Sequence, residues 1–138
     1  MTTLADDKLL NLEPGTADAL ASALGEPDWA VAVRRAGLKA WDDIAYPKNT
    51  DGEWRRTDPE RFRPEGRKVL AVEPTFELLG EGSGEGVVRT SLTEALRADE
   101  AGLREALFSG AQHQKEKFAA LTAAYRSGGA YVRIPEGA

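Results

Sequence analysis

Cysteine is absent from this sequence of 138 residues, which contains a single histidine and a single methionine. Without cysteine, the polypeptide can form no disulfide bond, no thiolate metal site and no thiol nucleophile. A lone histidine needs distant partners before it can act as a catalytic base or a metal ligand. Any thiolate-bound metal or cluster chemistry would therefore require residues from outside this sequence.

Long apolar runs and a basic charge excess are also missing. No run approaches the length of a membrane span, and the first ten residues, MTTLADDKLL, carry acids where a signal peptide would carry basic residues. The 23 acidic residues outnumber the 18 Lys and Arg, and the net charge of -5 disfavours phosphate backbones and anionic lipids. We therefore expect a cytoplasmic, soluble protein that binds neither nucleic acid nor membranes.

Helix signals dominate both ends of the chain. Thr16 can cap a helix over residues 16–24 that Gly25 ends, and Pro27 suits the first turn of a second helix. In that second segment apolar residues recur every three or four positions, with charged residues including Arg34 between them, which predicts an amphipathic helix. The apolar positions are Trp29, Val33, Ala36, Ala40, Trp41 and Ile44.

Two residues of the second segment carry specific expectations. Gly37 indicates either that a neighbouring helix approaches closely or that the helix is weakened there, and the sequence leaves both alternatives open. Trp29 begins the apolar stripe, so we expect it to be buried against the last helix or against the loop that contains the sequence EWRRTD.

The remainder predicts an α+β fold that is mainly helical, with a few short strands. Prolines and charges over residues 46–67 predict an extended loop that Trp54 and Phe62 anchor. Ser91 or Thr93 can cap a helix that runs to residue 110. A last helix near residues 113–126 carries Phe118, Leu121, Ala124 and Tyr125 on one face. The expected strands are residues 68–72, 76–79, 86–91 and 131–134.

No motif in the sequence predicts catalysis or cofactor binding. The glycine-rich run GEGSGEG at residues 80–86 lacks the spacing and the lysine of a phosphate-binding loop, so it predicts a flexible connection. His113 is expected to be an exposed residue near a helix N-terminus. The neighbouring acids Asp6–Asp7 and Asp42–Asp43 would point in different directions on a helix. We therefore expect no catalytic, cofactor-binding or metal-binding residues and no enzymatic activity.

One charged loop segment, EWRRTDPERFRPEGRK, has the composition of a phosphate-binding and stacking surface. Its six basic residues are interleaved with Trp54 and Phe62. The acids Glu53, Asp58, Glu60 and Glu65 leave it only mildly positive. The segment is best interpreted as a solvated loop with local ion pairs or as a surface for a protein partner.

Three stretches of the sequence resemble the SufB/SufD family of iron–sulfur cluster assembly scaffold proteins. The first, EPDWAVAVRRAGLKAWDDIAYP, is similar to the opening of these proteins. The second, YPKNTDGEWRRTD, resembles the signature of the SufD branch, although Arg56 stands where many members have Tyr. The third comprises GVVRTSLTEAL and KFAALTAAYRSGGAYVRIPEGA, in which Thr122 stands where Asn is common. The resemblance covers residues 26–138, and its SufD motif is carried by Pro47, Glu53, Trp54, Arg55, Thr57 and Asp58.

The resemblance implies a scaffold role and a position in a larger protein. In this family the last of these stretches leads into a parallel β-helix core. We therefore expect residues 1–126 to form a mainly helical N-terminal domain, with a charged loop near residues 46–68, and residues 127–138 to begin that core. The implied partners, through the full-length protein, are SufB and the ATPase SufC. The alternative hypothesis is a small acidic enzyme or ligand-binding domain that uses the EWRRTD loop as its site.

Overall fold

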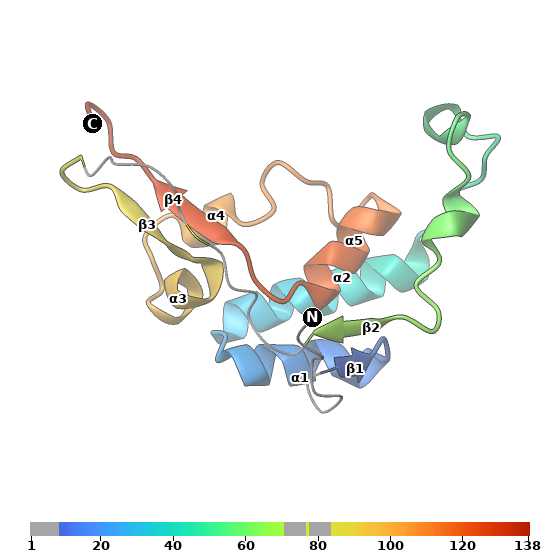
Figure 1. Ribbon diagram of the computed structural model, residues 1–138, viewed down its shortest axis with the longest axis horizontal. Helices are drawn as coiled ribbons and strands as arrows, with labels where there is room; N and C mark the ends of the chain where they lie inside the picture. Colours follow the sequence, from blue (N-terminus) through green and yellow to red (C-terminus); the bar gives the residue numbers. More distant parts are fainter. Residues whose placement is uncertain (1–8, 71–76, 78–83) are drawn as a thin grey trace.

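The computed structural model describes residues 9–70, 77 and 84–138. These residues form a mixed α+β domain with five α-helices and two antiparallel two-stranded sheets, so the predicted fold class is confirmed (Figure 1). In chain order the elements are β1 (Leu9–Asn11), α1 (Pro14–Leu24), α2 (Asp28–Asp43), β2 (Lys68–Leu70), β3 (Val88–Ser91), α3 (Leu92–Arg97), α4 (Leu103–Ala106), α5 (Lys117–Tyr125) and β4 (Ala130–Arg133).

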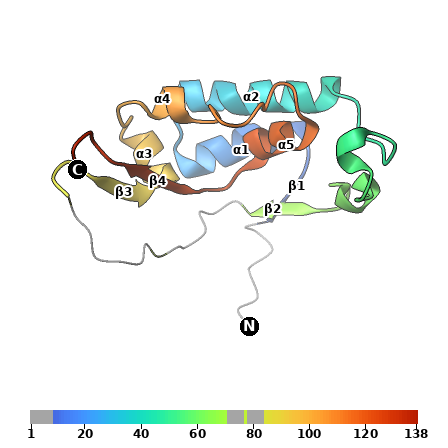
Figure 2. The ribbon, with the colours of Figure 1, turned by 90° about the horizontal axis from the view of Figure 1, so that it is seen from above.

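Helices α1, α2 and α5 form the centre of the molecule. Figures 1 and 2 show the β3–β4 sheet with α3 and α4 at one end, and the loop that follows α2 at the opposite end. None of the helices in the described part of the chain is long and apolar enough to cross a membrane.

The corner between α1 and α2 forms largely as the sequence predicts. Gly25 ends α1 in the left-handed conformation with φ 66°, which glycine adopts without the steric cost of a Cβ. The predicted helix start was wrong: α1 begins at Pro14, whose missing N–H is not needed in the first turn. Thr16 is therefore not the cap, and its hydroxyl donates to the carbonyl oxygen of Asn11.

The contact between α2 and α5 is very close at Gly37. A Cβ built there would lie 2.8 Å from the carbonyl oxygen of Ala120 and 2.8 Å from the Cβ of Ala123. Ala120, Ala123 and Ala124 are fully buried in this contact. Of the two alternatives for Gly37, close approach of a neighbouring helix is the correct one.

Arg34 is completely buried, which corrects the prediction that it lies on the polar face of α2. Its Nε and Nη2 donate to the two carboxylate oxygens of Glu26, both at 2.7 Å, and its Nη1 donates to the carbonyl oxygen of Ala124 at 2.9 Å. Arg126 also donates to Glu26, at 2.6 Å. A charged side chain can lie on the buried face of a helix when a carboxylate and a carbonyl oxygen accept hydrogen bonds from its N–H groups.

The Arg34–Glu26–Arg126 triad joins three parts of the chain: the corner before α2, α2 itself and the end of α5. The Glu26 side chain is 1% exposed and the Arg126 side chain 6%. The single carboxylate of Glu26 accepts hydrogen bonds from both guanidinium groups. Nε and Nη2 of Arg126 have no hydrogen-bond partner among the described residues. Glu26 is therefore the group on which both buried cations depend.

A second apolar cluster connects the start of α2 to α3 and α4. Its buried members are Ala30, Leu92, Ala95, Leu96 and Leu103. Trp29 and Tyr131 pack against it. The prediction that Trp29 packs against the last helix or the EWRRTD loop was therefore wrong. Its indole Nε1 donates to Asp99 at 3.2 Å, and the Arg104 guanidinium lies 5.5 Å from the centre of its ring.

We expect Trp29→Ala to lower the free energy of unfolding by about 2–3 kcal/mol, because the indole is only partly buried. Trp29→Phe keeps an aromatic ring on the cluster and should cost less. Chemical denaturation of the wild type and the two variants measures these differences. Equal midpoints for all three proteins would contradict the packing of Trp29 described above.

Two predicted helices are shorter than the sequence suggests. Ser91 does cap α3, since its hydroxyl oxygen accepts from the backbone N–H of Glu94 at 3.0 Å. The helix predicted to continue to residue 110 stops at Arg97, because Asp99 and Gly102 adopt positive φ angles of 50° and 81°. The last helix begins at Lys117, and the residues near His113 form turns.

The predicted C-terminal strand pairs with the strand predicted before α3. Strands β4 and β3 are antiparallel, with Tyr131 opposite Thr90 and Val132 opposite Arg89. Strand β2 pairs with β1, a strand that the sequence analysis did not predict. Most of the predicted strand at residues 76–79 and of the glycine-rich run at residues 80–86 lies outside the described residues. That residues 127–138 begin a β-helix core stays a prediction.

Candidate functional groove

The loop after α2 folds over the start of α5. It contains two short 3₁₀ helices, Gly52–Trp54 and Pro59–Phe62, in a region that the sequence predicted to be mostly irregular. Asp51 accepts a hydrogen bond from the backbone N–H of Lys48 at 2.8 Å. The hydroxyl of Tyr46 donates to the carbonyl oxygen of Pro59 at 2.8 Å, which ties the start of the loop to its second 3₁₀ helix.

Five aromatic rings from this loop, α2 and α5 form one cluster. Phe118 of α5 lies at its centre, with the Trp54 ring centroid at 5.2 Å, Tyr46 at 5.8 Å and Phe62 at 6.1 Å. Trp41 contacts both Tyr46 and Phe118. These separations are typical of stabilising aromatic pairs. The prediction that Trp54 anchors the loop on a helix is confirmed, since Trp54 packs on Phe118.

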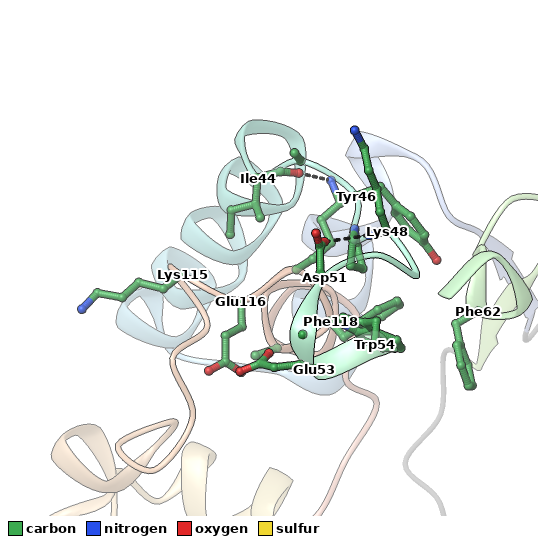
Figure 3. Close-up of a pocket in the computed structure, with 15 residues that line it drawn as sticks. Ile44, Tyr46, Lys48, Asp51, Glu53, Trp54, Phe62, Lys115, Glu116 and Phe118 are labelled. Atoms are coloured by element: carbon green, nitrogen blue, oxygen red, sulfur yellow. Dashed lines mark hydrogen bonds between the residues drawn. The ribbon is translucent and has the colours of Figure 1, made fainter. Parts of the chain in front are cut away.

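The aromatic cluster forms one wall of a groove of about 800 Å³. Figure 3 shows that the loop supplies one side of this groove and the start of α5 another. Phe62 remains 48% exposed although its ring contacts both Trp54 and Phe118. We call this the aromatic groove; its lining comprises Ile44, Ala45, Tyr46, Pro47, Lys48, Asp51, Gly52, Glu53, Trp54, Phe62, Lys115, Glu116, Lys117, Phe118 and Ala119.

The charged side chains of the groove differ in how well they are paired. Lys117 donates to the carbonyl oxygens of Trp41 and Ile44, and its ammonium lies 4.1 Å from the centre of the Trp41 ring. It therefore joins α5 to the end of α2. By contrast, the carboxylates of Glu53 and Glu116 make no hydrogen bond or ion pair within the described part of the chain. In Figure 3 these two carboxylates point toward one another, and Lys115 points away from the groove.

Burial raises the pKa of Tyr46, a shift that the nearby Arg63 guanidinium partly opposes. The guanidinium lies 3.7 Å from the centre of the Tyr46 ring. The phenol therefore stays protonated at neutral pH and acts as a hydrogen-bond donor. The lining residues include no serine, threonine, cysteine or histidine. The lining combines aromatic and apolar surface with carboxylate and ammonium groups, so the groove can bind apolar groups beside charged ones.

The other candidate residues do not converge on this groove. His113 is half-buried, with its ring 5.3 Å from that of Phe108, so the prediction that it is exposed was wrong. Asp43 pairs with Lys39 on the surface of α2. Over residues 9–70, 77 and 84–138 no group of three or more His, Cys, Asp or Glu side chains could hold a metal ion. Asp6 and Asp7 lie outside the described residues.

The basic loop segment forms the local ion pairs that the sequence predicts. Arg63 makes two hydrogen bonds to Glu60, each of 2.9 Å, and lies 3.8 Å from Glu65. Each of these side chains is at least 42% exposed. The interpretation of the segment as a solvated loop with local ion pairs is therefore confirmed for Arg63.

Comparison of the sequence with protein-family models and with curated proteins finds no match.

The aromatic groove brings together residues that the sequence analysis could not combine. The loop residues Glu53 and Trp54 were noted as motif residues, and Phe118 was placed on a helix face. Their contact joins positions more than sixty residues apart, which no local pattern reveals. The available signal was that aromatic residues occur in both the EWRRTD and KFAAL stretches.

Proposed function

We propose that this chain is the N-terminal interaction domain of a SufD-like component of the SufBCD iron–sulfur cluster assembly scaffold. One observation carries this proposal: residues from all three stretches that resemble the family line one groove. Ile44 and Ala45 come from the end of the first stretch, Glu53 and Trp54 from the second, and Phe118 from the third. Such convergence gives the motif residues a shared place in the fold, which supports a shared role.

The properties of the groove favour a structural and non-catalytic role. Aromatic side chains such as the half-exposed Phe62 and the partly buried Trp54 are typical anchors of protein interfaces. The lining residues include no Ser, Thr, Cys or His side chain, so the groove lacks the pairs of nucleophile and histidine that are typical of acyl transfer. The proposed setting is the cytoplasm, and the proposed partners of the full-length protein are SufB and SufC.

Co-expression tests this proposal. The complete reading frame that contains this chain, carrying an affinity tag, is produced together with SufB and SufC from the same organism. We expect the three proteins to co-purify in a complex that survives gel filtration. Co-expression with an equally tagged unrelated protein is the control. If the tagged protein elutes alone while SufB and SufC associate with each other, the proposed role is wrong.

A second candidate function is favoured by the size of the groove. Its volume of about 800 Å³ falls within the range of small-molecule binding pockets, about 300–1,000 Å³. A ligand-binding domain would use the same Trp54, Phe62 and Phe118 rings. Thermal stabilisation of the purified chain by a small aromatic or aliphatic metabolite, lost in Phe62→Ser, would favour this function over the scaffold role.

A further inference from the structure

The aromatic groove combines an apolar wall with unpaired acidic groups, and this combination defines what can bind there. The apolar wall is formed by Trp54, Phe62 and Phe118, whose ring centroids lie 5.2–6.1 Å apart. Phe62 is the most accessible of the three, with 48% of its surface exposed. Covering these rings removes apolar surface from water, which favours association.

Of the three acids that line the groove, Asp51 accepts from the backbone N–H of Lys48, whereas Glu53 and Glu116 have no paired cation among the described residues. Glu53 and Glu116 direct their carboxylates toward one another in Figure 3, from the loop and from the residue before α5. Of the three lysines of the lining, Lys117 is held by two carbonyl oxygens, Lys115 points away, and Lys48 lies apart from both carboxylates in Figure 3. Two carboxylates that line the same groove and have no paired cation create a negative potential beside the aromatic rings.

We propose that the aromatic groove is the docking site for a protein segment that carries a bulky apolar side chain next to an arginine or lysine. The apolar side chain covers Phe62 and Trp54, and the cation lies between the carboxylates of Glu53 and Glu116. Charge complementarity selects this occupant: an acidic segment would be repelled, and a purely apolar one would leave the carboxylates unpaired. An arginine can also stack on the exposed ring of Phe62.

This inference rests on the proposed function, because it specifies the kind of partner that the interaction domain would take. It does not depend on SufB or SufC being that partner. Its test therefore uses peptides, and the co-expression experiment remains a separate test of the scaffold role.

A display library of random twelve-residue peptides, panned on the purified chain, provides the test. We expect the enriched peptides to share a bulky apolar residue within two positions of Arg or Lys. The dissociation constant of one enriched, fluorescently labelled peptide is then measured. Phe62→Ser should weaken binding at least about 10-fold, since Phe62 is the accessible anchor. The double variant Glu53→Gln, Glu116→Gln should weaken it about 5-fold and reduce its salt dependence.

Two matched variants act as controls. Ile134→Ser removes another exposed apolar side chain, 66% exposed, that directly follows β4. Strand β4 lies at the end of the molecule opposite the loop (Figure 1). Glu105→Gln neutralises an exposed acid of α4. Neither should change the dissociation constant. The proposal is overturned if panning enriches no sequence, if the enriched sequences are acidic or lack an apolar residue, or if the control variants weaken binding as much as Phe62→Ser.

Discussion

Replacing Glu26 with alanine is expected to lower the free energy of unfolding by about 3–5 kcal/mol, which is a large part of the stability of a domain this size. The reason is that Glu26 is the shared partner of Arg34 and Arg126, both of which are buried. Without this carboxylate the two guanidinium groups face each other with little access to water. Urea denaturation monitored by tryptophan fluorescence measures the loss.

Two further variants make the test of the triad specific. Arg126→Met should cost less than Glu26→Ala, because it removes a buried cation with two unpaired donors and leaves the bidentate Arg34–Glu26 contact. Asp18→Asn breaks the exposed pair with Arg35 and should change stability little. A Glu26→Ala midpoint close to that of Asp18→Asn would show that the triad does not stabilise the fold.

The triad also makes stability depend on pH. Burial tends to raise the pKa of Glu26, but hydrogen bonds and charge interactions with Arg34 and Arg126 outweigh it, so the pKa is lowered in the folded state. A carboxyl with a lowered folded pKa stabilises the fold above its unfolded pKa of about 4.3, and this contribution is lost as the pH falls through the folded pKa. The unfolding free energy of the wild type should therefore fall below about pH 5, and that of Glu26→Gln should fall less.

Gly37→Ala is expected to destabilise the protein by about 2 kcal/mol, although alanine is the better helix former. The helix propensity of alanine favours the substitution by about 1 kcal/mol. The new methyl group, however, would lie 2.8 Å from the backbone oxygen of Ala120, so α2 and α5 must separate. Overpacking of this kind costs about 1–3 kcal/mol. The new Cβ would lie within 3.0 Å of three atoms, two of them backbone atoms, which puts this substitution at the upper end of that range and leaves the net loss of about 2 kcal/mol. Gly37→Val should cost more than Gly37→Ala. Thermal unfolding followed by circular dichroism measures both changes.

Gly15→Ala is the matched control for this substitution. Gly15 also lies within a helix, α1, but a Cβ there would meet no atom within 4 Å. This change should leave the stability unchanged or raise it. If Gly37→Ala raised the melting temperature as Gly15→Ala does, the close contact between α2 and α5 would be wrong.

Local signals in the sequence predicted the ends of the helices better than they predicted which segments pack against those helices. Gly25, Pro27 and Ser91 mark helix ends through backbone conformation and capping, which depend on residues close in sequence. The burial of Arg34 could not be predicted this way. It depends on Glu26 and on the Ala124 carbonyl oxygen, which lies ninety positions away along the chain.

Local sequence signals were limited in the same way for the residues of the aromatic groove. The sequence marked Trp54 and Phe62 as anchors within a loop, and periodicity placed Phe118 on a helix face. The surface against which Trp54 and Phe62 pack depends on the packing of α5 against α2, which Gly37 and the alanines of α5 permit. A pattern of small residues reports that a close contact is possible but does not identify the two surfaces that meet.

The pairing of distant segments has a consequence for how the chain folds as it is synthesised. Helix α2, complete at Asp43, finds its main partner only in α5, which starts at Lys117. Strand β1 likewise can pair only after β2 has been synthesised, and β3 only after β4. Such non-local contacts slow folding, because the intervening chain must be ordered before they form. On the ribosome, the face of α2 that carries Gly37 and Arg34 would stay uncovered until α5 has emerged, and a chaperone could bind there during that interval.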